Sequence, residues 1–235
     1  MSNSHDALII SEARSLRFLF RGQLLHLTAA VILTTIAWAL AAPVLNEGSW
    51  LGISEAGWFW AAVGLTIFHQ FYVWVVFRGQ LGWGFFTQLF GRYDLTVHSI
   101  LFSPMLIARP FVVIAAGMAS PLTLALPRWI QLAIGLMLLV PALYTGWSVK
   151  KYFGFKRAVG GDHFRQSYRN MPLVTEGAFS WTPNAMYTFA FFGLWSIALL
   201  LGSHLALVIA LFQHAFVWAH YFGTEQPNME LIYGE

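Results

Sequence analysis

The sequence contains no cysteine among its 235 residues. It therefore has no disulfide framework, no thiol nucleophile and no thiolate metal site. Charged residues are also scarce, at 10% of the chain against about 25% in a typical soluble domain. Hydrophobic residues instead make up 58%, and the mean hydropathy is +0.63. These proportions indicate an integral membrane protein.

The remaining polar residues do not form a metal-binding pattern. His214 and His220 are six positions apart, so they do not share a helix face as ligands at i and i+4 would. A Glu-x-x-His pair of the kind that builds a di-metal site is also missing from the sequence. The net charge is +3, but no basic run carries a nucleic-acid recognition motif. We therefore expect neither a metal nor a nucleic-acid partner.

The apolar runs predict an all-α polytopic bundle of about six membrane spans. Four spans are expected near residues 24–44, 57–77, 99–119 and 129–149. The run from Tyr187 to Phe222 would reach about 54 Å as one helix, against roughly 30 Å of hydrocarbon. A break at Gly202-Ser203 would fold this run into a C-terminal helical hairpin, which supplies spans five and six.

Two other segments carry local predictions. Within the N-terminal segment 1–23, residues 7–22 place three arginines at helical spacing on one face, which predicts an amphipathic helix on the membrane surface. The segment 78–98 is rich in glycine and aromatic residues, and its Gly82-Trp83-Gly84 triplet is expected to be a loop.

The distribution of Lys and Arg predicts the orientation. The N-terminal segment has three, the segment 78–98 has two and the segment 150–185 has six, whereas the links on the opposite side have only Arg128. Because cytoplasmic loops carry the excess of positive charge, both termini are predicted to be cytoplasmic. The hairpin then brings Asn184 and Glu225 to the same, cytoplasmic side of the membrane.

Several polar residues in or beside the spans are candidates for function. Glu225 follows the sixth span directly, where the helix dipole disfavours an anion, so it is either a solvated helix-end carboxylate or a group that holds a cation. His214 lies toward the same half of that span. His69 and Gln70 are expected to make interhelical hydrogen bonds. Arg109 is costly within a span, and is expected to snorkel, to pair or to face a lipid phosphate.

Three motifs in the last third carry a resemblance to a known family. Leu-Val-Thr-Glu-Gly-Ala-Phe-Ser-Trp-Thr-Pro-Asn-Ala-Met-Tyr (173–187) resembles the opening of the membrane methyltransferases, which include isoprenylcysteine carboxyl methyltransferases and phospholipid N-methyltransferases. Glu225-Gln-Pro-Asn-Met-Glu-Leu-Ile-Tyr233 is similar to the Glu-Glu-Pro…Glu-Ile-Tyr close of the phosphatidylethanolamine enzymes. Gly154-Phe…Gly161-Asp-His-Phe resembles their Gly-Phe…Gly-Asp-Tyr-Phe segment. The likeness covers about residues 150–235.

The chain departs from the family pattern at three positions. Ala185 replaces a proline, Asn184 stands where many members have histidine, and Gln226 replaces the second acid of the closing motif. These departures bear directly on the cofactor contacts.

The resemblance implies that S-adenosylmethionine (SAM) binds at the cytoplasmic end of the hairpin. By similarity, the cofactor is lined by Gly154, Gly161, Asn184, Tyr187 and Glu225. Glu225 or His214 would accept the proton that the acceptor amine loses. The chain would then comprise the N-terminal segment 1–23, four spans in 24–149, and a methyltransferase core in 150–235. The leading hypothesis is a SAM-dependent phospholipid N-methyltransferase that acts on phosphatidylethanolamine in the bilayer, with successive methylations toward phosphatidylcholine.

Two alternatives remain open at this point. The same fold could methylate an isoprenylcysteine carboxyl, a small thiol or another lipid. A non-catalytic scaffold or a small-solute transporter is the other possibility. A transporter would be expected to show paired broken helices in repeated halves, and the sequence contains no such repeat.

Overall fold

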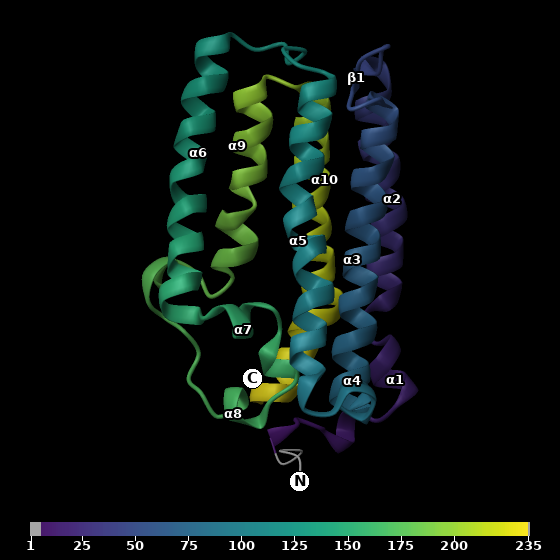
Figure 1. The fold of residues 1–235 in the computed structure, drawn as a ribbon, viewed down its shortest axis with the longest axis vertical. Helices are drawn as coiled ribbons and strands as arrows, with labels where there is room; N and C mark the ends of the chain where they lie inside the picture. The colour runs from purple at the N-terminus through teal and green to yellow at the C-terminus, as the bar shows by residue number, and fades with distance from the viewer. Residues whose placement is uncertain (1–5, 235) are drawn as a thin grey trace.

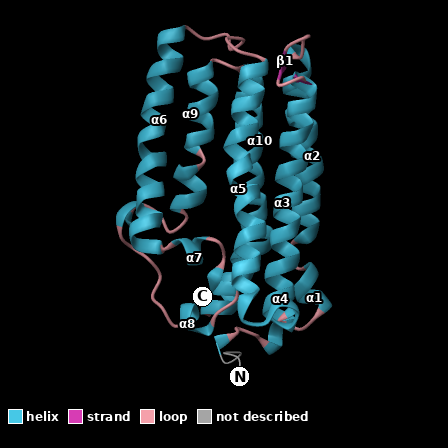
Figure 2. Ribbon diagram, in the orientation of Figure 1, coloured by secondary structure: helices cyan, strands magenta, loops and turns pink. Residues whose placement is uncertain are grey.

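The computed structural model describes residues 6–234, which form an upright bundle of helices (Figure 1). Its long helices are α2 (Gln23–Ala41), α3 (Glu55–Trp83), α5 (Asp94–Ala119), α6 (Arg128–Ser148) and α10 (His204–His220). The shorter α-helices are α1 (Leu16–Phe20), α4 (Phe85–Phe90), α7 (Phe155–Ala158), α8 (Gln166–Arg169), α9 (Phe192–Leu201) and α11 (Gln226–Tyr233). Within the described residues, the strands are limited to the hairpin of β1 (Ser49–Trp50) and β2 (Ile53–Ser54), so the chain is almost entirely helical (Figure 2).

Tighter and wider helical turns connect these elements. The 3₁₀ turns are η2 (Ser11–Ala13), η3 (Ala42–Val44), η4 (Gly91–Tyr93), η6 (Gly161–His163) and η7 (Gly177–Ser180). The π-helical turns are η5 (Val149–Phe153), η8 (Met186–Ala190) and η9 (Tyr221–Glu225). The all-α membrane bundle expected from the sequence is confirmed.

Five helical segments of the described chain are long and apolar enough to cross a membrane. They are Leu16–Val44, Glu55–Trp83, Phe85–Ala119, Arg128–Phe153 and His204–Tyr233. The segment expected as the fifth of six spans is shorter, because its apolar helix runs only over Met186–Leu201. At 1.5 Å per residue it reaches about 24 Å, somewhat less than the hydrocarbon thickness of roughly 30 Å.

The C-terminal hairpin breaks at the predicted position. Gly202 adopts a left-handed conformation with φ of 66° at the end of α9, which a residue with a side chain rarely tolerates. Ser203 then caps α10, because its hydroxyl accepts a hydrogen bond from the backbone N–H of Ala206. The two helices pack side by side (Figure 1).

Helix α10 is the centre of the bundle, since it packs against α2, α3, α5 and α9. The apolar core between these helices is rich in alanine, with fully buried examples on α3, α5, α9 and α10. Such small side chains let helix backbones approach closely in a membrane protein. Helix α6 packs on the outside against α9 (Figure 1).

The expectations for residues 7–22 and 78–98 are corrected by the structure. Instead of one surface helix, residues 7–22 form η2 and α1, and Leu8, Ile10 and Ala13 are buried. The segment after residue 77 is not a loop, because α3 continues to Trp83 and α4 follows at once. The N-terminal segment covers this extension of α3, as the Ile10 N–H donates to the Leu81 carbonyl at 2.8 Å.

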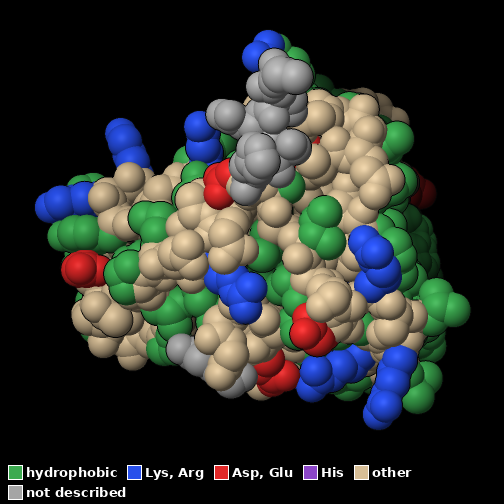
Figure 3. Space-filling view, turned by 90° about the horizontal axis from the view of Figure 1, so that it is seen from below, with side chains coloured by type: hydrophobic (Ala, Val, Ile, Leu, Met, Phe, Trp, Pro, Cys, Tyr) green, Lys and Arg blue, Asp and Glu red, His purple; other side chains and the backbone are tan. Residues whose placement is uncertain are grey.

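Both ends of the described chain lie at the same end of the bundle, as predicted (Figure 1). The Leu8 N–H donates to the Phe164 carbonyl at 3.0 Å, and the Arg169 guanidinium donates to the Ile232 carbonyl at 2.6 Å. The N-terminal segment, the 154–170 segment and α11 thus form one cap. Lys and Arg side chains spread over this surface (Figure 3).

Arg78 holds this cap onto the bundle from a position with no solvent exposure. Its guanidinium donates to the carbonyls of Phe18, Leu19 and Arg21 before α2, and to those of Gly223 and Thr224 after α10. Its Nε also donates to the Asn228 side chain at 3.1 Å. A planar guanidinium with five donors is suited to joining several chain segments in this way.

Candidate functional site

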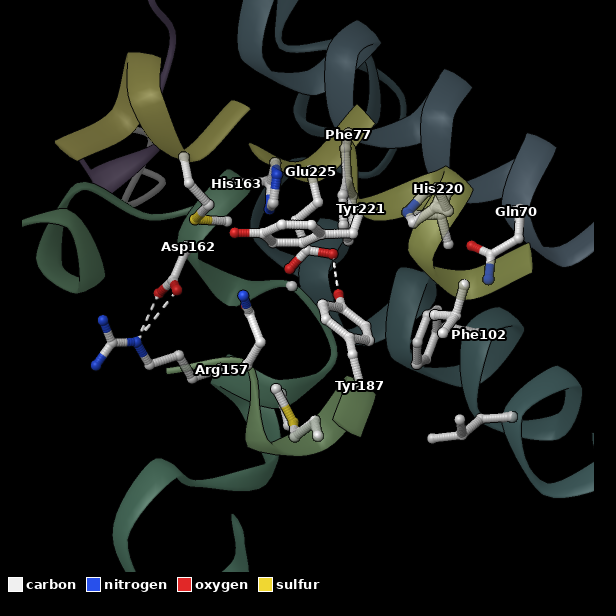
Figure 4. Close-up of a pocket in the computed structure, with 18 of the residues that line it drawn as sticks. Gln70, Phe77, Phe102, Arg157, Asp162, His163, Tyr187, His220, Tyr221 and Glu225 are labelled. Carbon is white, nitrogen blue, oxygen red and sulfur yellow. Dashed lines mark hydrogen bonds and ion pairs between the residues drawn. The ribbon is translucent and has the colours of Figure 1, made fainter. Parts of the chain in front are cut away.

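A cavity of about 320 Å³ lies between the bundle and its cap (Figure 4). Its walls come from α3, α5, the segment from Phe153 to His163, the start of the hairpin, and the chain from Val217 to Tyr233. This volume is in the range of small-molecule sites.

All three π-helical turns contribute to the cavity wall. Phe153 comes from η5, Met186 and Tyr187 come from η8, and Tyr221 and Glu225 come from η9. π-Helical turns are rare and occur frequently at functional sites, because the extra residue turns a side chain out of its regular helical position. Their convergence on one cavity marks this region as the candidate site.

Tyr187 and Glu225 form the centre of the site. The Tyr187 hydroxyl donates a hydrogen bond to the Glu225 carboxylate across the cavity (Figure 4). The two residues are 38 positions apart. Tyr187 lies at the start of the hairpin and Glu225 at its end, both beside the cap. The fold-back at Gly202-Ser203 is therefore what brings them together.

An ion pair between Arg157 and Asp162 forms the second polar group of the wall. Arg157 Nε lies 3.0 Å and 3.1 Å from the two Asp162 carboxylate oxygens, and both side chains are nearly fully buried. The Arg157 guanidinium also donates to the Tyr233 hydroxyl at 2.9 Å and to the Pro172 carbonyl at 3.0 Å. Burial raises the pKa of the Asp162 carboxyl, and the positive charge of Arg157 opposes this shift.

His163 is fixed by a chain of contacts that begins at Arg78. Because Arg78 donates to the Asn228 oxygen, the Asn228 amide nitrogen faces His163 Nε2, at 3.2 Å. The imidazole stacks on Phe77 with ring centroids 3.8 Å apart. Burial lowers the pKa of His163 from 6.5 to about 3. His163 is therefore neutral at pH 7, with Nε2 as the acceptor for Asn228.

We expect this depressed pKa to make the folded protein less stable in acid. Above pH 6.5 neither the folded nor the unfolded form binds a proton at His163. Below it only the unfolded form does, so the free energy of unfolding falls by about 1.4 kcal/mol per pH unit until the folded pKa is reached. Between pH 6.5 and 5 the loss is about 2 kcal/mol.

Denaturant unfolding in detergent at both pH values measures this loss. His163→Gln should show a correspondingly smaller loss. His204→Gln is the control, because His204 begins α10 at the end of the bundle away from the cap. This variant should show the same loss as the wild type. An unchanged pH dependence in His163→Gln would contradict the assignment.

The structure brings together three of the residues that the sequence proposed for the site. Asn184, Tyr187 and Glu225 all line the cavity. Gly154 and Gly161 are not among the lining residues, although Gly160, next to Gly161, is. His214 is also absent from the lining and stacks on Phe191, with ring centroids 5.2 Å apart. His220, six residues farther along α10, lines the cavity instead.

Other lining residues were not proposed from the sequence as part of the site. Arg157, Asp162 and His163 lie within or beside the Gly161-Asp-His-Phe motif, so that motif was the signal that could have identified them. Phe77 and Tyr221 have no comparable signal, since aromatic residues are frequent throughout this chain. His69, Gln70 and Arg109 also line the cavity; His69 makes the expected interhelical hydrogen bond, with Arg109, whereas Gln70 makes none among the described residues.

Gly160 lines the cavity and has no room for a side chain, because it packs against another cavity residue. Its φ is +94°, and a Cβ there would lie 2.2 Å from the Phe77 ring. Gly160→Ala should displace Phe77 from His163 and lower the free energy of unfolding by about 1–3 kcal/mol beyond the backbone strain. Gly154→Ala is the matched control, because Gly154 also has a positive φ of 86° but has open space around its Cβ position. Equal unfolding midpoints for the two variants would contradict this packing.

The described residues thus form a helical bundle of membrane-spanning length with a polar, aromatic-lined cavity under its cap. A family model for phospholipid methyltransferases matches residues 130–235. This stretch supplies α6, the cavity segment after it, the hairpin and α11. The C-terminal region of this chain thus resembles the phospholipid methyltransferases.

Curated relatives agree with this assignment. The chain is 36% identical over 76 residues to the phosphatidylethanolamine N-methyltransferase of Scheffersomyces stipitis, an alignment that covers 32% of this chain and 9% of the relative. It is 26% identical over 169 residues to the enzyme of the same name from Komagataella phaffii, covering 71% of this chain and 17% of the relative. The Clavispora lusitaniae enzyme of that name is 25% identical over 174 residues, covering 63% and 20%. The chain thus spans less than a quarter of the length of these relatives. No solved structure matches it.

Proposed function

We propose that this protein transfers a methyl group from SAM to the amine of a membrane phospholipid, phosphatidylethanolamine or its methylated forms. The observation that carries the proposal is that the family match and the cavity lining fall in the same stretch of the chain. The stretch that matches the phospholipid methyltransferase family, residues 130–235, also supplies Arg157, Asp162, Tyr187 and Glu225 to one cavity.

The lining of the cavity fits SAM. The carboxylates of Asp162 and Glu225 suit its ammonium group, and the aromatic faces of Phe77, Tyr187 and Tyr221 suit its sulfonium. The Nδ1 atoms of the lining residues His163 and His220 are buried with no hydrogen-bond partner within residues 6–234, so they are free to bind a polar ligand. Asn184 offers an amide beside Tyr187.

The reaction needs positioning and the removal of one proton. SAM, when bound, would supply a methyl group on a cationic sulfonium: the lipid amine would attack the methyl carbon in line, so that a C–N bond forms as the C–S bond breaks and S-adenosylhomocysteine leaves. Enclosure in the cavity orients the amine and excludes water. A low-dielectric site also lowers the pKa of an ammonium group, which favours the neutral, nucleophilic amine.

Glu225 is the residue that we assign to accept the proton, held in place by the Tyr187 hydroxyl. We assign His220 rather than His214 as the histidine near the reacting groups, because His220 lines the cavity. The excess of Lys and Arg at this end of the bundle supports a site that faces the cytoplasm. On this proposal, residues 1–23 and 24–149 cover and embed a catalytic core formed by 150–235.

Equilibrium binding of labelled SAM to the detergent-purified protein tests the cofactor, and acceptor profiling tests the substrate. We expect saturable binding that unlabelled S-adenosylhomocysteine displaces, and methylation of phosphatidylethanolamine in preference to a prenylcysteine or a small thiol. Saturable binding with turnover of the prenylcysteine or the thiol would keep the methyltransferase and change its acceptor. Absence of binding would favour a non-catalytic membrane protein and overturn the proposal.

A further inference from the structure

Arg109 lies in the middle of α5, 3% exposed, and lines the cavity. Its Nε donates to His69 Nδ1 at 3.2 Å, and its guanidinium lies 5.6 Å from the centre of the Phe191 ring. One of its terminal nitrogens, Nη2, is buried and has no hydrogen-bond partner among the described residues. The sequence left three roles open for Arg109, and burial against the cavity excludes snorkelling to the membrane surface.

A buried cation with an unused donor calls for an anion. Arginine stays protonated in proteins, and burying its charge without a counter-charge is costly. No carboxylate forms an ion pair with Arg109 among the residues that the structure describes. His69 accepts a hydrogen bond from Arg109 but carries no negative charge, so it does not balance the charge of the guanidinium. The anion that would do so belongs to a ligand in the cavity.

The position of Arg109 indicates which ligand this is. The other lining arginine, Arg157, is at the cap and is already paired with Asp162. Arg109 instead contacts the Phe191 ring and shares its helix with two apolar lining residues, Phe102 and Leu106, of which Leu106 is 43% exposed. An anion that reaches Arg109 past these apolar residues would be expected to be attached to hydrocarbon chains. A phospholipid phosphodiester has this combination of charge and apolar chains.

We propose that Arg109, together with the Gln70 amide of the same cavity, binds the phosphodiester of the acceptor phospholipid. This inference rests on the proposed function. Gln70 is 4% exposed, lines the same cavity, and makes no side-chain hydrogen bond within residues 6–234 (Figure 4). Its two N–H donors are therefore available in the cavity that Arg109 also lines.

This subsite would hold the acceptor at two points. Phe191, which contacts Arg109, follows Tyr187 by about one helical turn, so the cation lies close to the Tyr187–Glu225 pair. In phosphatidylethanolamine the amine and the phosphate are joined by two carbons. With the phosphate on Arg109, the amine is directed toward Glu225. An acceptor without phosphate would lose this alignment.

The test compares Arg109→Gln with the wild type in two measurements, kcat/KM for phosphatidylethanolamine in non-ionic detergent micelles and the Kd for SAM. We expect kcat/KM to fall roughly 10- to 100-fold, as for loss of a charge-assisted hydrogen bond, while the SAM Kd stays unchanged. Arg109→Lys should recover part of the loss, since it restores charge but not the planar fork. Arg92→Gln is the control, because Arg92 is exposed in η4 and its side chain bonds only to Tyr93 among the described residues.

Direct binding of dihexanoyl-phosphatidylethanolamine, followed by native mass spectrometry, tests the subsite without turnover. Weaker binding by Arg109→Gln with SAM affinity retained supports it, even if wild-type turnover proves to use another acceptor. Unchanged lipid binding and kcat/KM would overturn it. A raised SAM Kd would overturn it too, because Arg109 would then hold the cofactor carboxylate. Failure of the proposed function would instead appear as a wild-type protein that binds no SAM.

Discussion

We expect Glu225→Gln to lower the rate of methyl transfer roughly 100-fold or more, the loss typical of removing a positioned general base. The substitution keeps the shape of the side chain and removes its charge. It also removes a negative charge from a cavity that must hold a cationic cofactor, so SAM affinity should fall as well. The rate of label transfer to lipid and the SAM Kd are the two measurements.

Glu230→Gln is the matched control for this prediction. Glu230 lies on the same C-terminal segment, but its side chain is 37% exposed and pairs with Arg21 at the surface, at 3.1 Å. A surface ion pair contributes about 0–1 kcal/mol, so this variant should retain both rate and affinity. Tyr187→Phe should have an intermediate effect, because it removes the hydrogen bond to Glu225 and leaves the charge. Wild-type rate and affinity in Glu225→Gln would remove this residue from the site.

Arg78→Met is expected to cause the largest loss of stability. It removes the hydrogen bonds from the guanidinium to the five carbonyls before α2 and after α10, and it leaves the buried side-chain oxygen of Asn228 without its donor. Hydrogen bonds to a charged group contribute about 1.5–3 kcal/mol each, so the total loss should be about 3 kcal/mol or more. Thermal unfolding in detergent should show a large fall in Tm.

Arg78→Lys should rescue this loss poorly, because an ammonium group has three donors and cannot span the same carbonyls. Arg92→Gln should leave the Tm close to that of the wild type, since Arg92 is exposed. Arg78 also fixes Asn228, and through it His163, so the variant should bind SAM more weakly even where it remains folded. A Tm for Arg78→Met within a degree or two of the wild type would contradict the role of Arg78 as the anchor of the cap.

The role of Arg78 also explains where sequence reasoning placed an element boundary incorrectly. The second span was expected to end at residue 77, because a charged residue interrupts an apolar run. In the structure α3 continues to Trp83, because the Arg78 side chain is buried and hydrogen-bonded inside the protein. Its partners are carbonyls 57 or more positions away in the sequence. No local pattern shows that those carbonyls will be present. The burial of Leu8 and Ile10 against this extension of α3 was unpredictable for the same reason.

The hairpin and the central pair of the site could be predicted, because their signals are local. An apolar run too long for one crossing, with Gly202-Ser203 inside it, determines the fold-back. That fold-back brings Asn184, Tyr187 and Glu225 to one cavity. The contribution of Gly160 rather than Gly154 or Gly161 depends on where the Phe77 ring lies, and a motif of neighbouring glycines does not contain that information.

The most direct test of the central claim is methyl transfer by the purified protein in liposomes that contain phosphatidylethanolamine. SAM labelled in its methyl group is supplied, and the lipids are analysed by mass spectrometry. The account predicts label in mono-, di- or trimethylated phosphatidylethanolamine, with the distribution showing how far the reaction proceeds. Labelled lipid should be nearly absent with Glu225→Gln and unchanged with Glu230→Gln. An active SAM-binding protein that labels no phospholipid would contradict the proposed acceptor, and a protein that neither binds SAM nor labels lipid would contradict the account as a whole.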